Sequence, residues 1–299
     1  MTQTNQSPKV TVDARGCLFF VLSNGQVAPI NFTGLVAKEG LSRQVVRIAG
    51  GCKGLSDEFK ANMIPDFVDA FRTVDAEGNT VTEFTGTAFS GGTANVKDGV
   101  LLDDMVTNVP AALAAAYPCL AISTTPRTAD MALERTGGGL VVDNYGGRID
   151  YRQHAAMVVQ QNAADVLNWD GDLDVYLGLL EGWQSVGFKV GIIALNGGDV
   201  TRDEIYKALA RKIPVIVVEK SGREADAFIK AFRDGDFSAT AAEMRANLVK
   251  KNKSEAAADE VVAACKIAME SIDRNLVSIV PLSDVAAMRA ALLSRGLIG

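Results

Sequence analysis

The sequence contains a single histidine, His154, among its 299 residues. Metal sites built from several histidines are therefore excluded, and any Ser-His-Asp or Cys-His catalysis would have to use His154. A lone histidine within a predicted helical stretch is more often a surface or hydrogen-bonded residue than a catalytic base. We therefore expect no role for His154 in catalysis.

Cysteines are few and scattered, and no pair has the CxxC spacing of a zinc or redox motif. We expect reduced, mostly buried thiols, which are typical of a cytoplasmic protein. The N-terminal residues 1–7 are polar and uncharged. They lack the basic segment followed by an apolar segment that marks a signal peptide, so no signal peptide is expected. The longest apolar run, 109–122, contains Pro110 and Pro118 and is too short for a membrane span. The cysteines are Cys17, Cys52, Cys119 and Cys265.

An excess of positive charge is also lacking, since 30 Lys and Arg face 36 Asp and Glu, a net charge of −6. Without a basic run, a nucleic-acid partner is not expected. No GxGxxG follows the first predicted strand, and the P-loop-like spacing of 182–189 lacks the GK[ST] ending. An ordinary NAD dehydrogenase or P-loop NTPase is thus disfavoured, and no bound cofactor is expected.

What the sequence does contain is a repeated pattern of short apolar strands, each followed by an amphipathic helix. Continuous apolar strands alternating with such helices indicate a parallel sheet that is covered on both faces. We therefore predict an α/β fold: a Rossmann-like, doubly wound, mainly parallel sheet with helices on both faces and a helical C-terminal extension. The predicted strands are 44–49, 83–89, 119–123, 140–142, 188–195 and 213–218.

The remaining predicted elements lie before, between and after these strands. Asn24-Gly25 predicts a tight turn in a hairpin of 17–22 and 26–32, while residues 1–8 are expected to be disordered. Helices are predicted at 100–116, 151–168, 173–184 and 240–270, with an edge strand at 276–282. Thr240 and Glu243 have the spacing of a capping box. We expect one domain over 9–299, with a core at 44–235 and an extension at 236–299.

The sequence has 28 glycines, and several of them fall at the ends of predicted strands. Glycine lets the backbone approach a ligand closely, and the N–H groups of a following helix attract phosphate. In an open parallel sheet these turns gather at one edge, where ligands bind. For any single turn, a purely conformational role of glycine remains an open alternative. The turns are 50–51, 90–93, 196–198 and 221–222.

Residues 190–228, together with Phe89-Ser90-Gly91-Gly92-Thr93, resemble the SLOG superfamily. The resemblance is to its LSDAT branch, which also forms the N-terminal part of TRPM channels. It rests on the Asn196-Gly197-Gly198 turn, the Pro214 to Val218 strand and Ser221-Gly222-Arg223-Glu224-Ala225-Asp226. The resemblance implies a Rossmann-like domain that senses nucleotide-derived ligands such as ADP-ribose and its cyclic relatives, and that often forms oligomers.

The same superfamily includes the Lonely Guy phosphoribohydrolases, whose pattern is PGGxGTxxE. The sequence keeps Gly197, Gly198, Thr201 and Glu204 of that pattern but has Asn196 and Val200 where those enzymes have proline and glycine. The resemblance therefore leaves Glu204 as an alternative catalytic acid/base, with Arg127 or Arg223 on the phosphate. Thr201-x-x-Glu204 and Ser221-x-x-Glu224 also have capping-box spacing, which we favour as the role of Glu204.

Among charged residues, Arg223 offers a bidentate fork suited to phosphate, and Glu219 could accept ribose hydroxyls. Asp226 either contributes to the site or pairs with Arg223. No metal site is expected, because the calcium-loop spacing that starts at Asp170 has Val175 where glycine is required. The predicted ligand-binding residues are Gly50, Gly51, Ser90, Gly91, Gly92, Thr93, Thr124, Thr125, Asn196, Gly197, Gly198, Thr201, Glu219, Ser221, Gly222 and Arg223.

Three hypotheses follow for the function. The favoured one is a cytoplasmic sensor of a nucleotide-derived ligand, acting as a homo-oligomer or through a separate effector protein, with no catalytic residue. The second is an N-glycosidic hydrolase of a nucleoside monophosphate that uses Glu204 and Arg127. In the third, the helical tail 240–299 mediates assembly and the site no longer binds a ligand.

Overall fold

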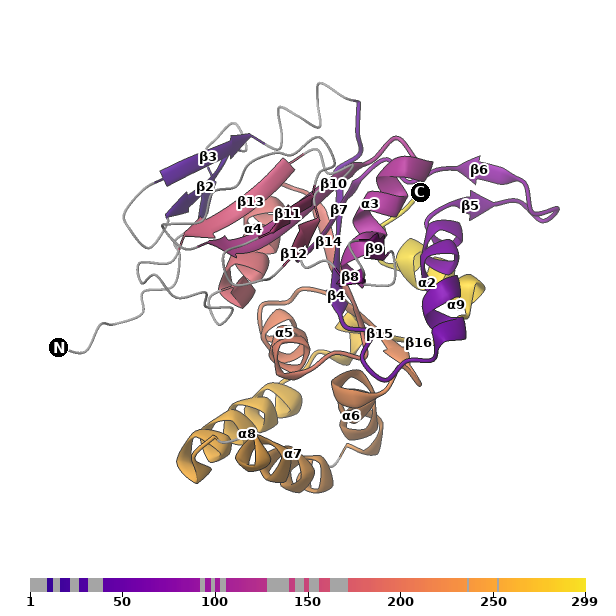
Figure 1. The fold of residues 1–299 in the computed structure, drawn as a ribbon. Coiled ribbons are helices and arrows are strands. Elements are labelled where there is room, and N and C mark those ends of the chain that lie inside the picture. The colour runs from indigo at the N-terminus through magenta and orange to yellow at the C-terminus, as the bar shows by residue number, and fades with distance from the viewer. Residues whose placement is uncertain are drawn as a thin grey trace.

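The computed structural model of the protein has a central sheet with helices on both faces (Figure 1). The structure describes only part of the chain. The described residues are 10–12, 17–21, 27–31, 40–91, 95–97, 100–102, 106–127, 140–142, 148–150, 156–161, 172–235, 237–251 and 253–299.

The central sheet has seven strands in the order β13-β10-β7-β4-β14-β15-β16, and each neighbouring pair is parallel. This arrangement confirms the predicted Rossmann-like, doubly wound fold. The strands are β4 (Gln44–Gly50), β7 (Thr87–Gly91), β10 (Leu120–Arg127), β13 (Ala156–Gln161), β14 (Lys189–Leu195), β15 (Val215–Glu219) and β16 (Val277–Pro281).

The chain reverses its direction of travel across the sheet between β4 and β14. From β4 it moves outward through β7 and β10 to β13, and it then returns to the other side of β4 and continues through β14 and β15 to β16. The loops that leave β4 and β14 at their carboxyl ends therefore diverge. In doubly wound sheets this switch point opens the crevice in which ligands bind.

Helices α2, α3 and α9 pack on one face of the sheet, and α4, α5 and α6 pack on the other, with α7 and α8 outside α5 and α6. The helices are α2 (Asp57–Ala70), α3 (Val109–Ala116), α4 (Asp172–Ser185), α5 (Asp199–Ala210), α6 (Arg223–Asp234), α7 (Ser238–Lys250), α8 (Glu255–Glu270) and α9 (Val285–Ser294). Short 3-10 turns are η1 (Val106–Asn108) and η2 (Arg274–Leu276).

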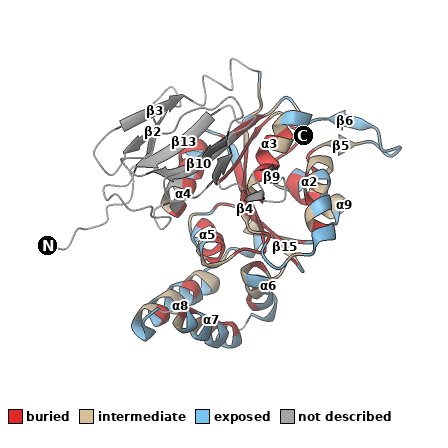
Figure 2. Ribbon diagram, viewed as in Figure 1, coloured by how far each residue is buried: buried red, intermediate tan, exposed pale blue. Residues whose placement is uncertain are grey.

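The central strands are buried on both faces, as Figure 2 shows by burial class. Along β4, Val45 and Ala49 belong to the core under α4 and α5, whereas Val46 and Ile48 belong to the core under α2 and α9. A strand between two layers of helices has no polar face, which explains the nearly continuous apolar run that the sequence showed.

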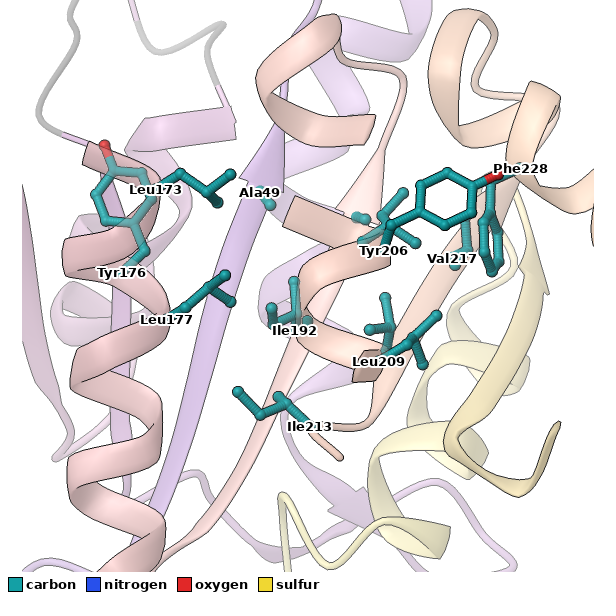
Figure 3. Packing of buried hydrophobic residues seen from close by; sticks show 14 of the residues in the cluster. Ala49, Leu173, Tyr176, Leu177, Ile192, Tyr206, Leu209, Ile213, Val217 and Phe228 are labelled. Atoms are coloured by element: carbon teal, nitrogen blue, oxygen red, sulfur yellow. The ribbon is translucent and has the colours of Figure 1, made fainter. Parts of the chain in front are cut away.

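The core on the α4 and α5 side is drawn in Figure 3. Leu177 of α4 and Leu209 of α5 point toward Ile192 of β14 and Val217 of β15, and Phe228 of α6 lies beside Tyr206. Each such side chain contributes about 1.5–3 kcal/mol by leaving water. This packing fixes where the first turns of α5 and α6 lie at the carboxyl edge of the sheet.

The predicted helix over 151–168 is wrong where the structure describes these residues. Residues 156–161 form β13, a strand that pairs in parallel with β10. Met157, Val158 and Val159 are consecutive apolar residues, and a run with β-branched side chains suits an extended strand better than a helix. The helix predicted over 173–184 is confirmed as α4.

Two further predictions are corrected between β7 and β13. The helix predicted over 100–116 begins only with α3 at Val109, and 100–102 form strand β9, paired antiparallel with β8 (Asn95–Lys97). The strand predicted at 140–142 exists as β11 (Leu140–Val142). It pairs antiparallel with β12 (Arg148–Asp150) in a separate two-stranded sheet.

The predictions at the two ends of the chain are largely confirmed. Strands β2 (Cys17–Val21) and β3 (Val27–Asn31) form the predicted hairpin, with β1 (Val10–Val12) added beside β2. The Asn24-Gly25 turn and residues 1–8 lie outside the described residues. The predicted edge strand is β16, and 240–270 are helical as α7 and α8.

The capping box predicted at the start of this helical tail is wrong. Helix α7 begins at Ser238 with Phe237 as its N-cap, and no side chain caps it. Thr240 lies inside the first turn and is buried. A short hairpin of β5 (Thr73–Val74) and β6 (Thr80–Thr82) completes the described elements. None of the described helices has both the length and the apolar character needed to cross a membrane.

Candidate binding site at the carboxyl edge of the sheet

Strands β4 and β14 lie close together at their carboxyl ends, where Gly50 faces Leu195. Gly50 closes β4 with φ +135°, and a Cβ atom placed on it would lie 2.0 Å from the carbonyl oxygen of Leu195. The next N–H, that of Gly51, donates to the same oxygen at 3.3 Å. No residue with a side chain fits at Gly50, so this predicted turn requires glycine for backbone packing.

Asn196 follows β14, and its hydrogen bonds connect the loops after β4, β14 and β15. Its side-chain Nδ2 donates to the carbonyl oxygens of Lys53 at 3.1 Å and Ser221 at 2.7 Å. Its backbone N–H donates to the hydroxyl of Ser221 at 2.7 Å, and that hydroxyl donates to the carbonyl of Val218 at 2.7 Å. Asn196 and Ser221 are both buried, and they hold the loops after β4, β14 and β15 in one arrangement.

The glycine pair after Asn196 is explained by two contacts. Gly197 has φ +79°, and a Cβ on it would lie 2.2 Å from the Thr201 hydroxyl, so Thr201 packs directly on the turn. Gly198 is the N-cap of α5, and no side chain caps this helix. The backbone N–H groups of the first turn of α5 therefore have no partner within the helix.

The turn between β15 and α6 has an unusual backbone. Lys220 and Arg223 have φ values of +63° and +53°, in the left-handed region that residues with a Cβ rarely adopt, and Gly222 between them has +87°. Such a conformation costs about 1–3 kcal/mol for each non-glycine residue and is concentrated at functional sites. It starts α6 at Arg223, with the N–H of Ala225 donating to the Asn196 carbonyl at 3.1 Å.

The Arg223 side chain lies across the two turns. Its Nη1 donates to Asn196 Oδ1 at 3.5 Å, and its Nη2 lies 2.9 Å from where a Cβ of Gly198 would be. The guanidinium is exposed and, within the described part of the chain, makes no ion pair. A larger residue at position 198 would require the Arg223 guanidinium to move from this place. A cationic fork thus sits between the first turns of α5 and α6.

Asp199, the first residue of α5, joins this turn to the helical tail. Its carboxylate accepts hydrogen bonds from Arg202 at 2.9 Å and from Lys251, just after α7, at 2.9 Å. Burial would raise the pKa of Asp199, but the hydrogen bond from Lys251 and the charge of Arg202 outweigh it and hold that pKa below its ordinary value. The residue also suits the positive end of the helix dipole.

Because the pKa of Asp199 is lower in the folded protein, its contribution to stability is present above the unfolded pKa of about 3.9 and is lost as pH falls below it. The free energy of unfolding of Asp199→Asn should therefore fall less on acidification than that of the parent protein. Urea unfolding at pH 6 and at about pH 3.5 measures this difference. Asp234→Asn, at the far end of α6, is the control, and an identical pH response of Asp199→Asn and the parent protein would contradict the assignment.

Glu204 does not have the capping role that the sequence favoured. Helix α5 starts too early for Thr201 to be its N-cap, so the Thr201-x-x-Glu204 capping box is wrong. The Glu204 carboxylate instead accepts from Arg47 Nε at 2.9 Å, and only 1% of its side chain is exposed. The Arg47 guanidinium stacks on the Tyr176 ring at 3.9 Å.

Burial raises the pKa of Glu204, and the neighbouring Arg47 opposes that rise. Sequence reasoning missed Arg47, which lies in the middle of the apolar strand β4. A charged residue inside such a run is the signal that could have revealed a buried partner, since buried charges are paired. The two residues are 157 positions apart, so no local pattern named Glu204 as that partner.

The second capping box is also wrong. Helix α6 has Gly222 as its N-cap and no side-chain cap, so Ser221 lies before the helix and Glu224 inside its first turn. The N–H of Gly222 donates to Asp226 Oδ2 at 3.0 Å, so Asp226 binds the backbone of the turn rather than Arg223. Burial raises the pKa of Glu224.

The other predicted site residues are spread along the same edge of the sheet. Ser90 and Gly91 end β7, and the Ser90 hydroxyl donates to the Thr107 carbonyl at 2.9 Å. Glu219 ends β15 and binds Arg233 of α6, whose hydrogen bond lowers the pKa of Glu219. Glu219 therefore already has a cationic partner at the far end of that helix.

Several predicted residues are placed by their backbone alone or not at all. Thr124 and Thr125 lie inside β10 rather than after it, with Thr124 opposite Gly91 of β7, and Arg127 is the last residue of β10. Gly92, Thr93 and His154 lie outside the described residues. The turns after β4, β14 and β15 are therefore the part of the predicted site that is brought together.

These features define a doubly wound α/β domain whose switch-point turns are closely packed and held by buried hydrogen bonds. Residues 153–288 match the sequence model of the family described as "SLOG in TRPM, prokaryote". This match agrees with the resemblance seen in the sequence motifs and covers β13 to the start of α9.

Other comparisons add little. No curated protein sequence matches the chain. One solved structure, the structural genomics target TM1055, is similar over 84% of this chain and 99% of its own. The identity is 13% and the TM-score 0.43.

Proposed function

We propose that the protein binds a nucleotide-derived ligand at the turns after β4, β14 and β15, and that it acts as a sensor. The proposed ligand class is ADP-ribose, or a cyclic derivative of ADP-ribose or NAD. The observation that carries the proposal is the Arg223 guanidinium, which lies over Gly198 beside the uncapped start of α5.

The chemistry of these turns suits phosphate. The uncapped start of α5 presents N–H groups and the positive end of a helix dipole to an anion. Arginine adds a planar fork that binds phosphate oxygens in pairs. Since the net charge is −6, an anionic ligand must be held by such local groups rather than by the overall field.

The left-handed backbone at Lys220 and Arg223 gives independent support. The conformation is unfavourable in itself, and the Asn196 and Ser221 hydrogen bonds hold the turn in place. A turn that is fixed before binding loses little conformational freedom when a ligand arrives, which favours affinity. The site is thus preorganised by buried groups, with Arg223 as its exposed contact.

Binding is favoured over hydrolysis by the position of Glu204. A general acid or base must reach the bond that it cleaves, through direct contact or one water. The Glu204 carboxylate is buried and occupied by Arg47, beneath the turn rather than at its surface. The alternative hydrolase, with Glu204 and Arg127, would have to separate this ion pair first.

The first test is ligand-dependent thermal stabilisation, because a ligand that binds only the folded state raises its stability. ADP-ribose should raise the Tm of the parent protein, with AMP, NAD and cyclic ADP-ribose isomers tested alongside. Arg223→Ala removes the charged hydrogen bonds and should weaken binding by roughly 10- to 100-fold. Isothermal titration calorimetry gives both dissociation constants.

Lys230→Ala is the matched control, since it removes one positive charge from an exposed position later in the same helix. It should leave the dissociation constant unchanged, whereas Arg223→Lys should recover only part of the affinity, because lysine lacks the fork. If none of the nucleotides shifts the Tm, or if Arg223→Ala binds as tightly as Lys230→Ala, the proposal is wrong.

A sensor also needs an output, which we place in a change of homo-oligomeric assembly or in binding to a separate effector protein in the cytoplasm. The contact between Lys251 and Asp199 supports a route, because it joins the proposed phosphate site to the α7 and α8 tail. Light scattering with and without ADP-ribose measures the assembly. An unchanged mass in both conditions would leave the effector protein as the output.

A further inference from the structure

Three loops at the carboxyl edge of the sheet each carry a cationic side chain. Lys53 lies in the loop after β4, Lys220 directly follows β15, and Arg223 begins α6. All three residues are exposed, and none of them makes an ion pair with another described residue. Since the net charge of the chain is −6, a local group of three cations without ion pairs is a candidate anion site.

The side-chain amide of Asn196 connects the three loops. Its Nδ2 donates to the carbonyl oxygens of Lys53 at 3.1 Å and of Ser221, the neighbour of Lys220, at 2.7 Å. Its Oδ1 accepts from Arg223 Nη1 at 3.5 Å. Asn196 is 1% exposed, so these hydrogen bonds are sheltered from water and hold the backbone. The flexible stems of both lysines therefore start beside the group that Arg223 contacts.

The acidic side chains of the same turns have other partners. Arg233 lowers the pKa of Glu219 by a hydrogen bond, and Lys220 adds a smaller effect. Burial raises the pKa of Glu224, and Arg202 opposes that rise more than Arg223 does. The hydrogen-bonded pairs are Glu219 with Arg233, Asp199 with Arg202 and Lys251, and Asp226 with the N–H of Gly222. The three cations thus keep their capacity to bind an added anion.

Three cations suit two phosphate groups better than one. A phosphate monoester carries about −1.5 to −2 charges at neutral pH. Arg223 and the N–H groups at the start of α5 can balance that charge. A second phosphate brings further negative charge, for which Lys53 and Lys220 supply the cations. The loops after β4 and β15, which carry them, flank the loop after β14 on its two sides.

We propose that Lys53 and Lys220 extend the Arg223 site so that it binds a diphosphate, an inference that rests on the proposed nucleotide-binding function. Arg223 binds one phosphate beside the start of α5, where its fork sets the orientation. The two lysines bind the other phosphate, since an ammonium on a flexible stem acts as an adaptable point charge. The ligand class is therefore nucleoside diphosphates and their esters, such as ADP-ribose, rather than nucleoside monophosphates.

ADP and AMP are the probes, because they differ only by the second phosphate group. Isothermal titration calorimetry, with EDTA present so that no divalent cation screens the phosphates, should show ADP binding about 10-fold more tightly than AMP. The double variant Lys53→Gln with Lys220→Gln should reduce this ratio to about 2 or less, because it keeps Arg223 and removes the cations of the second phosphate. Each single variant should weaken ADP binding about 3-fold.

Lys212→Gln is the matched control for Lys220→Gln. Lys212 is exposed and has φ +61°, close to the +63° of Lys220, but it precedes β15 and so lies at the opposite edge of the sheet. Its variant should keep the parent ratio of the two affinities. The double variant Lys53→Arg with Lys220→Arg should also keep a preference for ADP, because arginine is a cation that binds phosphate.

Failure of this inference can be told apart from failure of the proposed function. The two lysines are wrongly assigned if the parent protein binds AMP as tightly as ADP, if the double Gln variant keeps the parent ratio, or if Lys212→Gln lowers that ratio equally. The Arg223 site then stands as long as Arg223→Ala weakens both nucleotides. If neither nucleotide binds, or if Arg223→Ala binds both as tightly as the parent protein, the proposed function is wrong and this inference falls with it.

Discussion

Replacing Glu204 by alanine is expected to lower the free energy of unfolding by about 3–5 kcal/mol, the usual cost of removing one partner from a buried ion pair. The Glu204 and Arg47 side chains are 1% and 5% exposed, so neither charge has water to replace its partner. In this variant the Arg47 guanidinium stays buried beside Tyr176 and Phe89. An arginine does not lose its charge at any pH at which proteins fold.

Arg47→Met should cost less than Glu204→Ala, because a carboxylate left alone can take up a proton. Without Arg47, nothing offsets the burial that raises the pKa of Glu204. A raised pKa in the folded state means that stability is fully present below the unfolded pKa of about 4.3 and is lost as pH rises through the folded value. The deficit of Arg47→Met should therefore shrink at acidic pH, whereas that of Glu204→Ala should not.

Urea unfolding at pH 5 and pH 8 measures both deficits. The double variant Arg47→Met with Glu204→Leu is the control, since replacing both charges by apolar groups of similar size is often nearly neutral. It should be more stable than either single variant. A cost below about 1 kcal/mol for Glu204→Ala would show that the pair is not a buried structural element.

The sheet was predictable from the sequence because its central strands are apolar on both faces. Runs such as 188–195 and 213–218 can only be buried between helices, so β14 and β15 appeared with nearly their observed bounds. Strand β13 was missed because Met157 to Val159 form a short apolar segment whose period is ambiguous between strand and helix. Its parallel pairing with β10 makes this segment a strand.

The capping boxes failed for a related reason. The spacing Thr201-x-x-Glu204 is a local pattern, but Glu204 is buried by a contact with a strand far away in the chain. A buried carboxylate needs a buried cation as its partner, and Glu204 pairs with Arg47. Its side chain therefore cannot cap the start of α5. The same argument explains why the turn residues Gly197, Gly198 and Arg223 could be identified from the sequence, since they depend on backbone shape more than on distant partners.

Replacing Gly50 by alanine is the other change with a large expected effect, at least about 3 kcal/mol of stability. The new Cβ would lie 2.0 Å from the Leu195 carbonyl oxygen, and that oxygen belongs to the backbone of β14 and cannot swing away. The φ of +135° adds strain for any residue with a Cβ. Relief requires that β4 and β14 separate at the switch point, which would also loosen the turns proposed to bind ligand.

Gly51→Ala and Gly54→Ala separate the steric clash of a new Cβ from the backbone strain of a positive φ. At Gly51 the nearest atom to a new Cβ is the Cα of Gly197 at 3.9 Å, an ordinary contact, so this change should cost less than about 1 kcal/mol. At Gly54 the φ is +86° but the space is open, so only backbone strain remains, about 1–2 kcal/mol. Urea unfolding should rank the variants Gly51, Gly54 and Gly50 in rising cost. If Gly50→Ala costs no more than Gly54→Ala, the close approach of β4 to β14 is not what requires glycine there.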